Sequence, residues 1–470
     1  MSQPPITPEQ IAALPPEFQT LLRAVIDYYE RRIATLEAEV ATLKKTPRNS
    51  SLPPSTEHPH AKPPRNKKGS KKKPGGQPGH PKHERPLLPT EQCQVVIALK
   101  PENCRRCGET LAGKDPQPLR HQVWEIPEIK PEVTEYQRHR LTCPCCRTST
   151  CAELPAGVPH SQAGSRLVAL TALLMGCFRQ SKRRVALFLD YVLNQPCSPG
   201  WVVKLQQQAT VAVTPAYDEL VQCLPAEPIL GIDESPTKEG KVKAWLWTFV
   251  ATRYTVFAVR TTRAATILED LLTEEFEGVV NCDRAKMYWK RGKLQWCWAH
   301  LKRDFQALID HRDGQTKRLG YDLMRGTKEL FRHWSRCRDG TITYAGMQRL
   351  MRPIRLNVER LLLRGQFSGN SDLVGMCREL YAHREWLWTF LAVEGVEPTN
   401  NVSERALRHA VIWRKLSFGT KSPQGSRFVA TILTVVETCR QQSRNVFEYL
   451  TTAMEAHFAH QPAPLLLPRV

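Results

Sequence analysis

The sequence contains no long apolar run. Nowhere in its 470 residues do about 18 apolar residues follow one another, the length that a helix needs to cross a bilayer. The chain also begins without the short apolar core of a signal peptide. We therefore expect a soluble cytoplasmic protein that has no membrane partner.

Acidic residues are in deficit. Asp and Glu number 46 against 67 Lys and Arg, which leaves a formal net charge of +21 at pH 7. Such a surplus favours a polyanionic partner, because phosphate backbones are bound through the release of counterions. Nucleic acid is the leading candidate, and the length of the chain allows several domains.

Residues 49–86 lack apolar side chains almost entirely. Between Lys62 and Arg85 there are nine Lys or Arg and one acid, Glu84. Such a segment cannot bury enough surface to form a core, so it is either a solvated linker or a flexible arm that lies along phosphates. We favour the arm, whose DNA contacts would be Lys67, Lys68, Lys71, Lys72 and Lys73.

A heptad pattern precedes this arm. Its apolar positions are Leu22, Ile26, Tyr29, Ile33, Leu36, Val40 and Leu43. Steps of four and three predict a coiled coil of about three heptads. The alternative is a lone amphipathic helix.

Few of the 15 cysteines have metal-site spacing. Several stand singly in apolar segments, where small buried side chains are expected. Cys104 and Cys107 form one CxxC pair, and Cys143 and Cys146 form another 35 residues later. Two such pairs, joined by the alternating segments HQVWEI and EYQRHRLT, predict a four-cysteine zinc ribbon, with Cys145 as the alternative to Cys146.

Residues 164–215 have a helical pattern. SRLVALTALLMGCF and KRRVALFLDYVL are two expected helices, and Ser198-Pro199 begins a third with an N-cap and an N1 proline. Helices joined by a short turn predict a helix-turn-helix-like unit that binds DNA. Lys204 is its DNA-contact candidate, and Gln206, Gln207 and Gln208 suit either DNA or solvent.

Strand patterns begin near residue 228. PILGID, KAWLWTFVA and YTVFAVR predict three strands, AATILEDLL a helix, and GVVNCD a fourth strand. A right-handed crossover would make the first and fourth strands parallel neighbours. Asp233 and Asp283, at the ends of those strands, would then meet at the carboxyl edge of the sheet.

Two adjacent carboxylates call for a cation. Mg²⁺ is the best match, and a two-metal site for phosphoryl transfer needs a further carboxylate. Glu404 is the candidate, on a helix capped by Asn400 or Asn401, with Arg405 and Arg408 directed at phosphate. The alternative is that each acid serves an ordinary cap, turn or salt bridge.

At these residues the sequence resembles the insertion sequence 66 transposases of the TnpC type. The resembling blocks are GIDESPTKEGKVKAWLWTFV, NCDRAKMYW, LQWCWAHLKRDF and EPTNNVSERALRHAVIWRKLSFGTKSPQGSRFVATILTVVETC. NSSLPPS, GQPGH and the four-cysteine segment also match the family's layout. The chain departs from it at Ser235, where Thr is usual, and at Arg284, where Gly is common.

The resemblance implies a multidomain protein with an α/β RNase H-like DDE nucleotidyltransferase core. Asp233, Asp283 and Glu404 would be its ligands for Mg²⁺ or Mn²⁺. We expect a coiled coil at 1–46, a basic linker at 47–87, a zinc-binding domain at 88–157 and a helical DNA-binding region at 160–226. The core would comprise 227–304 and 396–455, interrupted by a helical insertion at 305–395 and followed by a tail at 456–470.

The implied activity is cutting of double-stranded DNA at transposon ends and joining to target DNA. Arg405, Arg408, Arg414 and Lys415 would hold phosphates. His300 would move protons, hold DNA or be an ordinary helix histidine. We further expect a bacterial, nucleoid-associated homo-oligomer that works with or without helper proteins of its element. A non-catalytic zinc-containing DNA-binding regulator is the main alternative, and a structure-selective nuclease is another.

Overall fold

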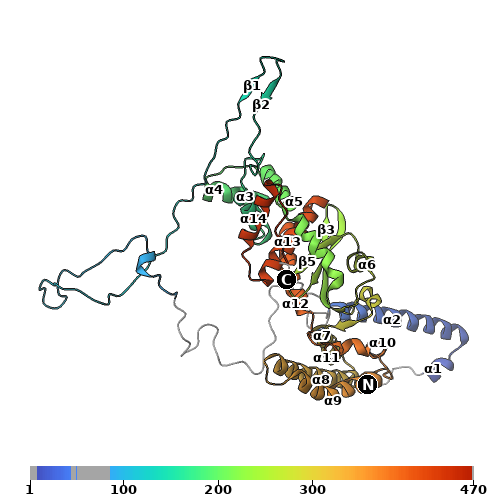
Figure 1. Ribbon diagram of the computed structural model, residues 1–470. Coiled ribbons are helices and arrows are strands. Elements are labelled where there is room, and N and C mark those ends of the chain that lie inside the picture. The colour runs from blue at the N-terminus through green and yellow to red at the C-terminus, as the bar shows by residue number, and fades with distance from the viewer. Residues whose placement is uncertain (1–7, 44–48, 50–84, 468–470) are drawn as a thin grey trace. The chain divides into compact units, whose positions relative to one another are not determined.

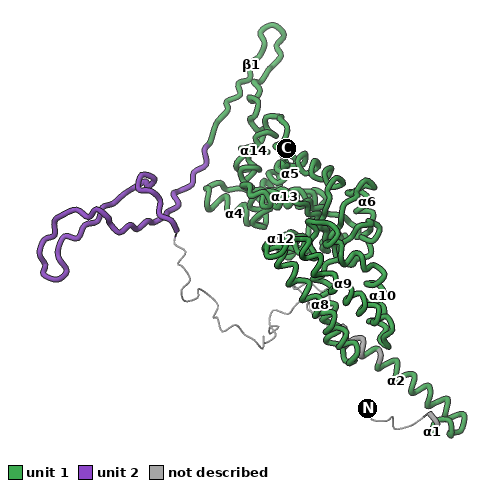
Figure 2. Tube along the Cα trace, turned by 60° about the horizontal axis from the view of Figure 1, so that its bottom comes forward, with its two compact units in different colours: residues 1–59, 133–470 green, residues 60–132 purple. Residues whose placement is uncertain are grey.

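The computed structural model describes residues 8–43, 49 and 85–467. The predicted DNA-contact lysines at 67–73 lie outside the described residues. The chain divides into two compact units, residues 60–132 and the remainder of the chain (Figure 2). The boundary near residue 132 falls inside the segment expected to bind zinc.

A five-stranded mixed sheet lies at the centre of the larger unit. Its strands are β3 (Ile229–Glu239), β4 (Val242–Val250), β5 (Thr255–Arg260), β6 (Val279–Cys282) and β7 (Leu294–Trp296). They are arranged in the order β5-β4-β3-β6-β7, and β4 is antiparallel to its neighbours while β6 and β7 run parallel to β3. The predicted meander and the parallel pairing of the first and fourth strands are confirmed.

Two details of the sheet differ from expectation. β3 does not end at Asp233 but continues to Glu239, because residues 233–239 pair with β4. β7, whose three residues are all buried, was not predicted. A segment of only three residues, Leu-Gln-Trp, is too short to show a strand period.

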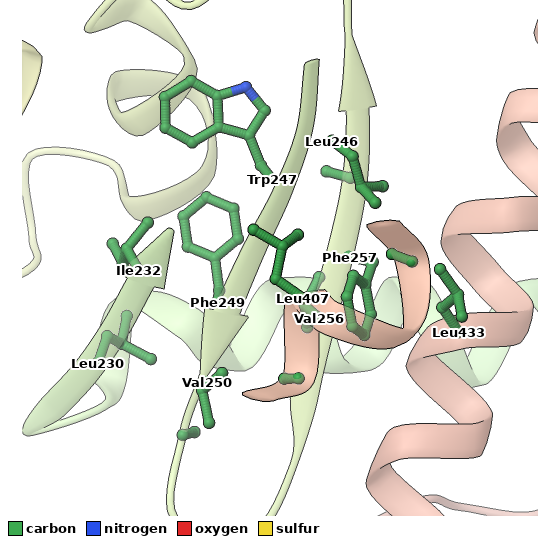
Figure 3. Close-up of a cluster of buried hydrophobic side chains, with 14 of the residues drawn as sticks. Leu230, Ile232, Leu246, Trp247, Phe249, Val250, Val256, Phe257, Leu407 and Leu433 are labelled. Atoms are coloured by element: carbon green, nitrogen blue, oxygen red, sulfur yellow. The ribbon is translucent and has the colours of Figure 1, made fainter. Parts of the chain in front are cut away.

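Two helices cover one face of the sheet, α12 (Asn401–Ser417) and α13 (Pro423–Gln441). Figure 3 shows Leu407 of α12 and Leu433 of α13 with the strand residues Leu246, Val250 and Phe257, which the register places on the same face as Gly231. Leu230, Ile232, Phe249 and Val256, also drawn in Figure 3, alternate with these residues and lie on the opposite face. These side chains are buried, and each such burial stabilises the fold by about 1.5–3 kcal/mol.

Helix α13 also protects the edge of the sheet at β5. The hydroxyl oxygen of Thr434 accepts the amide of Phe257 at 2.9 Å, and that of Thr438 accepts the amide of Thr255 at 3.2 Å. Unpaired amides on an edge strand would otherwise invite pairing with another chain. The hydroxyls therefore complete the hydrogen bonding of this edge.

The predicted helices before the sheet are confirmed. They are α3 (Ser165–Gly176), α4 (Lys182–Leu193) and α5 (Pro199–Cys223), and α14 (Val446–Phe458) packs against α3 and α5 (Figure 1). The hydroxyl of Ser198 accepts the amide of Trp201, as expected of an N-cap. Lys204 is exposed on α5, but Gln206 is buried, so it is not available to DNA.

The segment between β7 and α12 is helical, as expected. Its helices are α7 (Trp298–Ile309), α8 (Gly314–Arg338), α9 (Tyr344–Gly365), α10 (Ser371–Ala382) and α11 (Thr389–Ala392). Side chains of Asp313, Thr343 and Asn370 cap α8, α9 and α10. The helix α6 (Thr266–Leu272) connects β5 to β6.

The cysteine-rich region contains little regular structure. β1 (Arg140–Thr142) and β2 (Ser149–Cys151) form a short antiparallel hairpin. Residues 121–126, expected to alternate as a strand, are irregular, and their apolar side chains Val123, Trp124 and Ile126 are exposed. Without a face to bury, the alternating pattern does not produce a strand.

Helices α1 (Pro8–Ala12) and α2 (Pro16–Leu43) form the amino-terminal part. The predicted helix is thus confirmed, and its seam residues Ile26, Tyr29, Ile33 and Leu36 are exposed. The coiled coil itself stays a prediction. None of the helices in the described ranges is long and apolar enough to span a membrane.

Candidate active site

The register of two parallel strands brings the two aspartates together. Ile229, Leu230 and Gly231 of β3 pair with Val279, Val280 and Asn281 of β6. Asp233 and Asp283 each follow the last pair by two residues, so both lie at the same level of the sheet. Because side chains alternate along a strand, Asp233 is on the same face as Gly231.

Gly231 faces α12 at very close range. A Cβ atom placed on it would lie 2.4 Å from Oγ of Ser403 and 3.0 Å from Oδ1 of Asn400. Only glycine allows α12 to approach β3 this closely. This contact places Glu404, the residue after Ser403, above the strand that carries Asp233.

Asn400 connects the start of α12 to β3. Its Nδ2 donates to the carbonyl oxygen of Ile232 at 2.7 Å, and its backbone amide donates to Sγ of Cys297 at 3.2 Å. The side chain does not cap α12, in contrast to the prediction. The side chain is instead oriented by its bond to the carbonyl just before Asp233, a tertiary partner that the sequence does not reveal.

Asn281 holds the segment that leads into α12. Its Nδ2 donates to the carbonyl oxygens of Glu397 at 2.8 Å and Thr399 at 3.1 Å. Asn281 lies on β6, two residues before Asp283. Both aspartate-bearing strands therefore fix the position of Glu404 through asparagine side chains.

Asp233 lies among other acids that repel its charge. Burial raises the pKa of Asp233 well above its ordinary value, and the charges of Glu234, Asp283 and Glu404 raise it further. Oε1 of Glu404 is buried and has no hydrogen-bond partner among the described residues. A cation among these oxygens would relieve both effects, so the residues present suit a hard divalent ion such as Mg²⁺.

Glu234 is occupied by a structural pair. Its Oε1 accepts Nε of Arg263 at 2.7 Å, and its Oε2 accepts the hydroxyl of the buried Tyr288. Arg263 also lies over the ring of Trp245 at 5.1 Å. These partners leave Glu234 poorly available as a metal ligand.

His300 lies beside Glu404. Its Nε2 is 3.8 Å from Oε1 of Glu404, and its Nδ1 is buried with no hydrogen-bond partner in the part of the chain that the structure describes. Sγ of Cys297, a ring nitrogen of His300 and a carboxylate oxygen of Glu404 lie within 4.8 Å of one another. Burial raises the pKa of Cys297 to about 11, so its sulfur is a neutral thiol at pH 7.

The sequence did not predict a role for Arg284, the residue after Asp283. Its guanidinium is 2.9 Å from Oδ2 of Asp304 on α7 and 3.1 Å from Oε1 of Glu379 on α10. Burial raises the pKa of Asp304, and the charge of Arg284 opposes that rise. Arg284 thus connects the helical segment to the loop that carries Asp283.

A basic stripe runs along α12. Arg405, Arg408 and Lys415 are exposed, and their spacing by three and seven places them on one side of the helix. Arg414 behaves differently. Its Nη1 donates to Oγ of Ser235 at 3.1 Å and to the carbonyl of Pro236, so it joins α12 to β3 rather than facing solvent.

The two CxxC pairs have the same local geometry. The amide of Cys104 donates to the carbonyl of Glu109 at 2.8 Å, and the amide of Gly108 donates to the carbonyl of Cys104 at 2.9 Å. Cys143 makes the equivalent bonds with Thr148 and Arg147, both at 2.9 Å. Gly108 and Arg147 both have positive φ, at 76° and 59°. Each turn thus has the tight form that can present two sulfurs to one metal.

Hydrogen bonds favour thiolates in both turns. The pKa of Cys104 is lowered by backbone amides of Cys107 and Arg106. The pKa of Cys146 is lowered to about 7, mainly by the hydroxyl of Thr148. Thiolates are the form that binds Zn²⁺.

Comparisons with known proteins agree with these observations. Residues 160–427, more than half of the chain, match the model of the transposase IS66 family. Residues 101–147 match the zinc-finger binding domain of transposase IS66, and residues 5–86 match a family of unknown function (DUF6444).

One curated protein of Sinorhizobium fredii (strain NBRC 101917 / NGR234), named "Uncharacterized protein y4qI", is similar to this chain. It is 26% identical over 244 residues, which cover 47% of this chain and 45% of that protein. The match therefore spans less than half of the length of this relative.

Proposed function

The chain belongs to the IS66 family of transposases, and on that premise we propose that it is a DNA transposase with an RNase H-like core. Its reaction would be cutting of DNA at transposon ends, followed by joining of the freed 3′ ends to target DNA. The strand order with one antiparallel strand, and acids on the first and fourth strands, support this fold.

The observation that carries the proposal is the convergence of three acids. Asp233, Asp283 and Glu404 come from β3, the end of β6 and α12, and the charges of the latter two raise the pKa of the first. None of the three acids forms a salt bridge with a Lys or Arg of the described residues, which suits metal binding better than structural pairing. We assign them as ligands of two Mg²⁺ or Mn²⁺ ions.

When bound, such ions activate the attacking oxygen and stabilise the leaving oxygen. The chain's own residues do the positioning. Arg405, Arg408 and Lys415 would bind phosphates along α12, and Asn400 and Asn281 hold Glu404 in place. His300, at 3.8 Å from Glu404, would orient that carboxylate.

The cysteine pairs would form a structural zinc site. Its ligands are Cys104, Cys107, Cys143 and Cys146, in keeping with the shared turn geometry and the match at residues 101–147. We propose that this module and the lysines of residues 67–73 bind double-stranded DNA of the transposon ends. Self-association through the exposed seam of α2 would pair two ends.

The test is a strand-transfer assay in Mg²⁺ with the element's own end DNA. Glu404→Gln should lower joining at least about 100-fold, since it removes one metal ligand, while end binding is retained. The matched control is Glu448→Gln, because Glu448 is also in the first turn of its helix and is exposed.

Other outcomes separate the rival functions. Unchanged joining by Glu404→Gln would remove Glu404 from the site. Nicked DNA without joined products from the wild-type protein would indicate a nuclease. End binding with no joining by the wild-type protein would favour the regulator.

A further inference from the structure

The far end of α12 presents an exposed aromatic ring. Phe418 follows the last helical residue, Ser417, and is 83% exposed. Its φ of 59° is left-handed, a conformation that favours glycine, yet glycine stands one position later at Gly419. A bulky residue in this conformation is strained, and such strain persists where the surrounding structure holds it.

The surrounding structure does hold it. The amide of Phe418 donates to the carbonyl of Arg414, and the next residues bond to the β3–β4 turn. There the amide of Thr420 donates to the carbonyl of Lys238, and the amide of Gly240 donates to the carbonyl of Thr420, both at 2.9 Å. The ring therefore projects from a fixed backbone.

Four exposed lysines flank this ring, at the carboxyl end of α12 and on the β3–β4 turn beside the half-buried Glu239. Besides Phe418, the exposed residues here are Leu416 and Val242 together with Lys238, Lys241, Lys415 and Lys421, a set that we call the Phe418 tip. None of the four lysines has an ion-pair partner within the part of the chain that the structure describes. The centres of protein–protein interfaces are poor in lysine, so this combination fits a polyanion better than another protein.

Both β3 and α12 lead from the candidate metal ligands to the Phe418 tip. Six residues of β3 separate Asp233 from Glu239, which gives about 20 Å at the rise of a strand. Fourteen residues separate Glu404 from Phe418, which gives about 21 Å at the rise of a helix. Glu239 and Thr420 form a β-bridge, so both routes reach one place. The exposed Arg408 and Lys415 lie between the ends.

Resting on the proposed function, we propose that the Phe418 tip binds DNA that has unpaired bases, with one base stacked on the ring of Phe418. Lysines contact phosphates of any DNA, whereas a protruding ring gains stacking energy on the exposed face of an unstacked base. At about 20 Å the contact lies about six base steps from the metal ligands. It would hold an opened part of the transposon end or target.

The experiment measures binding by the full-length protein without added divalent metal. The probes are a fluorescein-labelled forked DNA with ten unpaired nucleotides on each arm and a fully paired duplex of the same length. Phe418→Ala should weaken fork binding about tenfold and duplex binding less than twofold. Phe418→Trp should bind the fork as the wild type does. Phe367→Ala, which removes another ring that is 83% exposed, should change neither.

Two further measurements make the result specific. 5-Bromouracil in an unpaired arm should cross-link to the peptide that contains Phe418. Phe418→Gly should lose fork binding without lowering the unfolding temperature, because glycine accepts the left-handed backbone.

The inference is overturned if Phe418→Ala binds the fork normally and no cross-link forms at this peptide. It is also overturned if the variant weakens fork and duplex equally, or if it alters self-association and leaves fork binding unchanged. These outcomes do not involve catalysis. Loss of joining in Asp233→Asn would uphold the proposed function even if the Phe418 inference failed.

Discussion

Asp233 and Glu234 are adjacent acids with different surroundings. The pleat of β3 directs them to opposite faces of the sheet. The carboxylate oxygens of Glu234 accept hydrogen bonds from Arg263 and Tyr288. The charged groups that act on Asp233 are, in contrast, other acids, which raise its pKa in addition to burial. One residue of register thus separates a structural ion pair from a candidate metal ligand.

The raised pKa of Asp233 predicts a pH-dependent loss of stability without metal. An aspartate ionises near pH 4 in the unfolded chain, and the folded protein resists this ionisation. The stability present at low pH is therefore lost as the pH rises through the raised pKa. Asp233→Asn does not titrate, so at pH 8 it should be more stable than the wild type.

Thermal unfolding from pH 4.5 to 8, without added divalent ions, would measure this difference. Mg²⁺ should then stabilise the wild type and not the variant. Asp270→Asn, at an exposed position on α6, serves as the control. Parallel pH profiles for the wild type and Asp233→Asn would contradict the prediction. Intact strand transfer by Asp233→Asn would contradict the assignment of Asp233 as a metal ligand.

At the scale of elements, α12 carries or leads to three of the features proposed to act on DNA. Its first turn carries Glu404, its exposed side carries basic residues, and its carboxyl end leads to Phe418. Arg414 and Asn400 attach it to β3 near both ends. The distance between helix and strand is set at Gly231.

Gly231→Ala should push α12 away from β3. We expect a loss of about 1–3 kcal/mol in the free energy of unfolding, because the added methyl group overlaps Oγ of Ser403. Joining activity should fall as Glu404 moves. Chemical denaturation and the strand-transfer assay would measure the two effects.

A second substitution makes this prediction specific. Ser403→Ala removes the overlapping atom, which has no hydrogen-bond partner, so the double variant should regain part of both losses. Gly375→Ala on α10, where the new Cβ meets nothing within 4 Å, should be neutral or stabilising. Equal effects at both glycines would show that close approach is not the cause.

At the scale of the whole molecule, DNA binding would be divided among several segments. The basic arm, the cysteine-rich module and α12 are far apart in the sequence, and each is basic or borders basic residues. Electrostatic contacts of this kind weaken steeply as salt concentration rises.

Zinc content tests the cysteine-rich module in the intact protein. We expect one Zn²⁺ per chain in the wild type and its loss in Cys104→Ser and in Cys146→Ser, because a tetrahedral site needs all four thiolates. Cys145→Ser is the matched control and should keep the metal. Mass-spectrometric metal analysis would measure the zinc content. Zinc retained by Cys146→Ser but lost by Cys145→Ser would show that Cys145, and not Cys146, is the fourth ligand.

The sequence by itself determined the local elements and the residue types of the site. Apolar periods marked the helices α3 and α4 and the strands β4 and β5, and CxxC spacing marked the zinc module, since these patterns depend on near neighbours. Strand ends and a helix start marked Asp233, Asp283 and Glu404, and family resemblance added the DDE core and the chain's membership among the IS66 transposases.

Only the tertiary structure decided how these residues meet. The extension of β3 past Asp233, the attachment of Asn400 to Ile232, the partners of Arg284 and the strained exposure of Phe418 all depend on segments distant in sequence. No local period records such contacts, because backbone pairing and side-chain hydrogen bonds across elements are settled when the elements pack. The close approach that Gly231 permits is the clearest case, since its reason lies 172 residues further along the chain, at Ser403.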